Sequence, residues 1–64
     1  MGKWIEVINT SGDIELINLN KLTNIGLKSD IVYLSDVGGN YSKIYFDNKY
    51  DSLVDFINSK RVDM

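Results

Sequence analysis

The stretch from Tyr41 to Ile57 constrains the fold most, because it joins an alternating segment to a helical one. Residues 41–47 alternate polar and apolar side chains around Ile44 and Phe46, which is typical of a strand with one buried face. Apolar side chains then recur at the i, i+3, i+4 and i+7 spacing of a surface helix, at Tyr50, Leu53, Val54 and Ile57. We therefore expect a strand followed by a helix that covers one face of a sheet.

The sequence also suggests where this helix begins and ends. Asn48 is the expected N-cap, with Asp51 as a capping-box partner three residues later. Lys60 and Arg61 follow the stripe, where positive charge complements the C-terminal end of the helix dipole. These signals predict a helix of about ten residues.

The first half of the chain has the pattern of a hairpin. Residues 3–8 and 14–19 both alternate, and the turn-forming cluster Asn9–Asp13 separates them. Trp4, Glu6 and Ile8 are expected on one face of the first strand. Residues 18–22 then interrupt the alternation, which predicts a corner or a single helical turn.

Two more strands are expected before Tyr41. Residues 22–28 read as a strand in which Gly26 marks a bulge or the close approach of another backbone. Residues 31–34 are apolar on both faces, as in a central or doubly covered strand. Asp36–Asn40 is the next turn. The predicted fold class is α+β: an antiparallel meander sheet of four to five strands with one C-terminal helix.

Size and residue types limit the chemistry. A chain of 64 residues forms a single domain, residues 1–64, and buries only about 60% of its unfolded surface. It has no cysteine and no histidine, so disulfides are excluded and the commonest acid–base and nucleophilic roles are vacant. We expect no enzymatic activity, no metal site and no cofactor. An efficient core or self-association remains as a way to stabilise so small a domain, and we expect a homo-oligomer.

Charge and hydropathy limit the partners and the cellular location that we expect for this protein. The net charge is −2 and the pI about 4.7, with seven basic residues scattered among nine acidic ones, so nucleic-acid and anionic-membrane binding are disfavoured. No apolar run approaches the roughly 20 residues of a membrane span. The first residues lack a secretory pattern, and we expect a cytoplasmic protein. The absence of Ala and Pro beside abundant Ile, Asn and Lys indicates an AT-rich genome.

The order of segments also resembles known small proteins. The run Ile17–Leu22, followed by Ile25, precedes a strand, a turn, another strand and a helix. This order resembles small uncharacterised β-rich proteins of low-GC bacteria and their phages, and is more distantly similar to the FlbD/SwrD-like flagellar and swarming proteins. The resemblance covers most of the chain and implies a β-rich fold, but it provides no catalytic residues to carry over.

Aromatic side chains are the main candidates for a binding surface. If Ile44 faces the core, then Tyr41, Lys43 and Tyr45 face outward together. Such a stripe can be a protein interface, a platform for nucleic-acid bases, or ordinary cross-strand packing. We predict a protein-binding surface that includes these three residues and Trp4.

Two polar clusters are weaker candidates. Gly38, Gly39 and Asn40 resemble a phosphate-binding nest, although their place between strands favours a hairpin turn whose tip contacts a partner. Asp47, Asp51 and Asp55 are spaced as an acidic ridge on a helix, which could bind a metal or a basic partner, although solvated acids favoured by the positive end of the helix dipole are the preferred explanation.

Three functions follow, in order of preference. The first is a small interaction module, encoded by a phage or mobile element, that binds another protein. The second is a small-molecule or nucleotide binder that sequesters its ligand at a site between subunits. The third is nucleic-acid binding.

Overall fold

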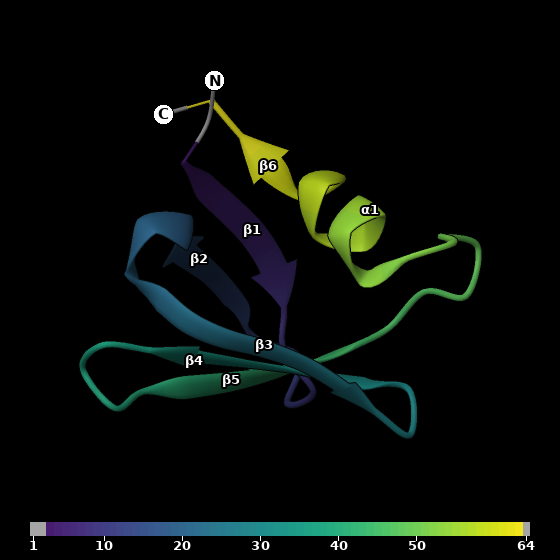
Figure 1. Cartoon of the computed structure of the whole chain (residues 1–64), viewed down its shortest axis with the longest axis horizontal. Coiled ribbons are helices and arrows are strands. Elements are labelled where there is room, and N and C mark those ends of the chain that lie inside the picture. The colour runs from purple at the N-terminus through teal and green to yellow at the C-terminus, as the bar shows by residue number, and fades with distance from the viewer. Residues whose placement is uncertain (1–2, 64) are drawn as a thin grey trace.

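The computed structural model describes residues 3–63 and consists of two small antiparallel sheets and one short helix (Figure 1). Its elements, in chain order, are β1 (Trp4–Ile8), β2 (Ile14–Asn18), the 3-10 helix η1 (Leu19–Lys21), β3 (Leu22–Lys28), β4 (Ile31–Asp36), β5 (Tyr41–Tyr45), α1 (Leu53–Asn58) and β6 (Arg61–Val62). Sheet A has the strand order β2-β1-β6, and sheet B has the order β3-β4-β5. The chain is therefore a small β-rich domain.

The predicted hairpins are present, but they do not form one sheet. β1 pairs with β2 from Trp4↔Asn18 to Ile8↔Ile14. The strand predicted to be central, β4, lies between β3 and β5 in sheet B. The structure does not confirm a single meander of four to five strands, because η1 redirects the chain between β2 and β3. The Asn18 side chain caps this turn by accepting a hydrogen bond from the backbone N–H of Asn20 at 2.9 Å.

The two sheets meet where β1 ends. Asn9 forms an isolated antiparallel bridge with Ile44 of β5. The backbone N–H of Thr10 also donates to the carbonyl of Lys43 at 2.9 Å. These contacts hold the start of the first turn against the edge of sheet B, and the side chains between the sheets form the core.

The core follows the alternation of the strands. Ile5 and Val7 point inward from β1, whereas Glu6 and Ile8 are exposed on the opposite face. Among the described residues, the buried apolar side chains are Ile5, Val7, Val32, Leu34, Ile44, Phe56 and Ile57. The Phe56 ring makes edge-to-face contacts with Phe46 and Tyr50, at centroid distances of 5.1 and 5.7 Å. These contacts attach the loop before α1 to the core.

The helix begins later than the sequence predicts. Its N-cap is Ser52, whose hydroxyl accepts a hydrogen bond from the backbone N–H of Asp55 at 3.1 Å, so the predicted Asn48 cap is wrong. The buried helix residues are Phe56 and Ile57, while Val54 is exposed. No basic residue occupies the last turn of α1. Lys60 and Arg61 follow the end of the helix, and Arg61 is the first residue of β6.

Three further details differ from the sequence expectation. The chain continues past α1 into β6, which pairs with Trp4 and Ile5, so the helix is not the last element. The irregular register of β3 lies between Leu22 and Asn24 and not at Gly26. A Cβ added at Gly26 would have no neighbour within 4 Å, so close backbone approach does not explain this glycine.

Within residues 3–63, no helix has the length and apolar character needed to cross a bilayer.

Candidate functional site

The outer face of sheet B carries most of the predicted binding residues. The register places Tyr33 of β4 opposite Lys43 of β5, with Tyr41 and Tyr45 on either side of Lys43 on the same face. Tyr41 and Tyr45 are 65% and 64% exposed, whereas Ile44 between them is 1% exposed. We call Tyr33, Tyr41, Lys43 and Tyr45 the tyrosine face.

The charge of the tyrosine face differs from that of the whole chain. The register also puts Lys28 of β3 on this face, opposite Ile31 of β4, which separates it from Tyr45 of β5. Lys28 and Lys43 are the charged residues among the strand positions of this face, although the chain carries a net charge of −2. The face is thus a locally basic, aromatic surface on a three-stranded sheet.

The Gly-Gly-Asn segment is a hairpin turn at one end of sheet B. Asp36 Oδ1 accepts hydrogen bonds from the backbone N–H groups of Gly38 and Asn40, at 2.9 and 3.0 Å. Gly39 has a φ of +83°, which a residue with a side chain rarely adopts. The nest donors of this turn are thus occupied by Asp36, and the exposed tip remains available only as a contact surface.

Trp4 lies apart from the tyrosine face. It belongs to β1 in sheet A, where its neighbours across the strands are Asn18 and Val62. The side chain is half-buried on the face that also carries the exposed Ile8. The binding residues predicted from the sequence are therefore divided between the two sheets.

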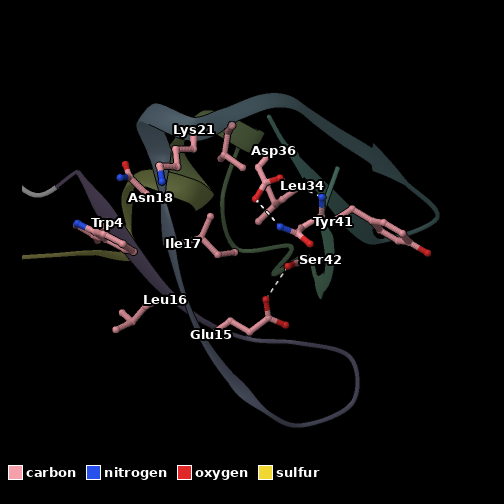
Figure 2. A pocket seen from close by; sticks show the side chains of 12 residues that line it. Trp4, Glu15, Leu16, Ile17, Asn18, Lys21, Leu34, Asp36, Tyr41 and Ser42 are labelled. Atoms are coloured by element: carbon pink, nitrogen blue, oxygen red, sulfur yellow. Dashed lines mark hydrogen bonds between the residues drawn. The ribbon is translucent and has the colours of Figure 1, made fainter. Parts of the chain in front are cut away.

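A cleft of about 250 Å³ brings some of these separated residues together (Figure 2). Its apolar floor is formed by Ile17, Leu22 and Leu34, which also border the core. One wall is β2 and the opposite wall is the start of β5. Of the residues predicted from the sequence, the cleft lining includes Trp4, Asn40 and Tyr41; of those not predicted, it includes Glu15, Lys21, Asp36 and Ser42.

Glu15 is the polar side chain of this cleft that bonds to residues of two other segments. Its Oε1 accepts a hydrogen bond from the Ser42 hydroxyl at 2.6 Å, and its Oε2 accepts one from the Asn9 side-chain amide. The hydrogen bonds from Asn9 and Ser42 lower the pKa of Glu15 below its ordinary value of 4.5. The carboxylate thus stays ionised and links sheet A to sheet B. Sequence reasoning missed Glu15 because its two partners lie in other strands and turns.

The predicted acidic ridge does not form. Because α1 begins at Leu53, Asp47 and Asp51 lie in the preceding loop and only Asp55 is helical. Asp47 is paired with Lys49, with 3.8 Å between Oδ2 and Nζ. Within residues 3–63, no group of three or more acidic side chains is arranged to hold a metal ion.

No protein-family model matches this chain, and neither a curated protein nor a solved structure matches it. The tyrosine face and the cleft are therefore the features from which a function is inferred.

Proposed function

We propose that this protein is a small interaction module that binds another protein through its tyrosine face. The observation that carries the proposal is the pair Tyr41 and Tyr45, each about two-thirds exposed on either side of Lys43. Tyrosine is enriched among the residues that dominate protein–protein binding energy, because it offers a large contact area and a polar end with few rotatable bonds. Strand pairing in sheet B fixes the backbone of these tyrosines before a partner binds, which reduces the entropic cost of association.

Packing within the chain does not account for these tyrosines. A tyrosine used for cross-strand packing would be covered by its neighbours, yet Tyr41 and Tyr45 remain mostly in solvent. Tyr50 is the contrasting case, because its ring packs edge-to-face on Phe56 at 5.7 Å. Of the four tyrosines, Tyr50 thus packs on the core, whereas Tyr41 and Tyr45 on the tyrosine face expose most of their surface to a partner.

The test is partner capture followed by affinity measurement. Immobilised protein is used to isolate binding proteins from a bacterial or phage-infected lysate, and the dissociation constant of a purified partner is then measured by calorimetry. The double variant Tyr41→Thr/Tyr45→Thr keeps residues that favour strands. We expect it to weaken binding about tenfold or more, since loss of each interface tyrosine costs more than about 1 kcal/mol.

The matched control is Val54→Thr, because this valine is 67% exposed in α1, outside both the tyrosine face and the Asp36–Asn40 turn. The control should bind the partner like the parent protein. Equal affinity of the tyrosine variant and the control would contradict the proposed surface.

Single-stranded nucleic acid is the second candidate for the same face. The observation in its favour is the combination of exposed tyrosines with Lys28 and Lys43, since base stacking and phosphate contacts are the usual components of single-strand binding. Fluorescence anisotropy with a labelled oligonucleotide tests it. A nucleic-acid surface should bind more weakly as salt is added, whereas absence of binding at low salt rejects this candidate.

A further inference from the structure

The outer edge of β2 is open. In the strand order β2-β1-β6, β2 is at one end of sheet A, and no other strand in the described range pairs with it on its far side. An open edge presents backbone donors and acceptors that can pair with another extended chain. The sequence has no proline to block such pairing.

The register identifies which backbone groups are free. The N–H of Asn9 donates to the carbonyl of Asp13, and the N–H of Leu19 donates to the carbonyl of Lys3. In an antiparallel ladder, bonded and non-bonded pairs alternate, so residues an even number of positions from Asp13 and Leu19 bond to β1. The remaining residues of β2, including Ile14 and Leu16, therefore direct their backbone N–H and C=O groups away from β1.

The cleft lies directly beside this edge. Four consecutive residues of β2, Glu15–Asn18, line it, which shows that the backbone edge borders the space and not just one face of the strand (Figure 2). Its volume of about 250 Å³ is below the range of about 300–1,000 Å³ that is usual for small-molecule sites. Side chains of a longer extended segment suit this space better than a separate ligand.

The charged side chains that line the cleft indicate which kind of extended segment would bind there. Glu15 and Asp36 are both held by neutral donors, Glu15 by the Ser42 hydroxyl and Asp36 by backbone N–H groups. Each carboxylate has more acceptor sites than these bonds use. Lys21 is the basic residue in the lining, so the two carboxylates leave an excess of negative charge for an incoming cation.

We propose that an extended segment of a partner protein adds to sheet A along the edge of β2, with an aliphatic side chain on the Ile17–Leu34 floor and a Lys or Arg beside Glu15. An added strand continues the pleat of sheet A, so the side chains opposite Glu15 and Ile17 point into the cleft. This inference goes beyond the proposed function, because it uses the open edge of β2 in sheet A; of the tyrosine face, Tyr41 alone lines the cleft.

A second copy of the chain suits this edge less well. Antiparallel pairing of two β2 strands about Leu16 would place the two Glu15 side chains diagonally on one face, about 7–8 Å apart. Each chain also has a net charge of −2. A basic segment relieves this repulsion, whereas a second copy adds to it.

The experiment uses a displayed library of random nine-residue peptides, selected on the full chain. We expect selected peptides to carry Lys or Arg two residues from an aliphatic residue, since those positions share a face in a strand. Backbone amide exchange is then measured by NMR with one selected synthetic peptide. The Leu16 amide should exchange at least tenfold more slowly when the peptide is bound.

Two variants separate edge pairing from unfolding. Leu16→Pro removes an N–H that faces the open edge and should preserve the β1–β2 ladder while abolishing peptide binding. Glu15→Gln keeps the side-chain shape and should weaken binding of Lys- or Arg-containing peptides several-fold, even if Leu16→Pro does not fold. Tyr45 lies outside the cleft lining, so Tyr45→Thr should bind the peptide normally. The peptide experiment therefore tests the β2 edge independently of the function proposed for the tyrosine face.

Other outcomes would overturn the inference. The inference is wrong if the selected peptides lack Lys and Arg, or if a peptide binds without slowing exchange of the Leu16 amide. It is also wrong if Glu15→Gln binds basic peptides as tightly as the parent protein. Protection of Leu16 that grows with protein concentration in the absence of peptide would assign the edge to a second copy instead.

Discussion

Glu15 connects the stability of the protein to pH at the level of a single residue. Its pKa is lowered in the folded chain by the hydrogen bonds from Asn9 and Ser42. A carboxyl group with a lowered folded-state pKa stabilises the fold above its unfolded-state pKa, here about 4.5, and this contribution is lost as the pH falls through the lower folded-state value.

We therefore expect the parent protein to be more stable than Glu15→Gln at about pH 7, and the difference in unfolding free energy to shrink towards about pH 3. Urea unfolding at both pH values measures this difference. A difference that is independent of pH would show that the ionised form of Glu15 gains nothing from Asn9 and Ser42.

Substitution of Gly26 and of Gly39 by alanine should change the free energy of unfolding in opposite directions. Gly26 lies in the interior of β3 with open space where a Cβ would be, so Gly26→Ala should raise the free energy of unfolding by about 0.5–1 kcal/mol. Gly39 has a φ of +83°, so Gly39→Ala should lower it by about 1–2 kcal/mol. Thermal and urea unfolding of both variants test the pair. Equal effects would be inconsistent with the backbone described for these two positions.

At the level of elements, α1 shows how a short helix depends on its cap and on core contacts. A helix of six residues is too short to be stable by its own hydrogen bonds. Ser52 satisfies a backbone donor at its start, and Phe56 and Ile57 attach it to the core. Two sets of residues fit the apolar spacing of a helix here: Tyr50, Leu53, Val54 and Ile57, or Leu53, Phe56 and Ile57. Only packing against the core decides which set the helix buries.

The two candidate caps give a direct comparison. Ser52→Ala should reduce the free energy of unfolding by about 1 kcal/mol, because it removes the acceptor for the Asp55 N–H. Asn48→Ala should change it by less than about 0.5 kcal/mol, because Asn48 is an exposed loop residue. Urea unfolding measures both variants, and a larger effect at Asn48 would restore the cap that the sequence suggests.

At the scale of the whole molecule, the outer face of sheet A is left uncovered. Ile8 and Ile14 are opposite each other across β1 and β2 and are 64% and 67% exposed, and Leu16 beside them is 49% exposed. Glu6, opposite Leu16, is the charged residue among these strand positions. An apolar sheet face of this kind favours contact with another apolar surface.

We therefore expect association that increases with protein concentration, measured by light scattering and native mass spectrometry. Ile14→Lys should weaken it at least tenfold, since burial of an isoleucine contributes about 1.5–3 kcal/mol. Val37→Lys is the matched control, because Val37 is 70% exposed in the β4–β5 turn, away from this face. A protein that remains monomeric at high concentration, or equal behaviour of the two variants, would exclude this role for the face.

The sequence by itself determined the local features of this protein. Alternation located β1, β2 and β5, an apolar run located β4, and the two asparagines near η1 marked the corner between β2 and β3, because these signals depend only on neighbouring residues. It also placed Tyr41 and Tyr45 on the face opposite Ile44. The tertiary structure decided the division into two sheets, the start of α1, the pairing of β6, and the cleft in which Glu15 meets Ser42. The sheet division, the β6 pairing and the cleft depend on residues far apart in the chain, and no local pattern encodes which of them come into contact. The start of α1 has a local cap at Ser52, but the packing of Phe56 and Ile57 in the core selects it over Asn48.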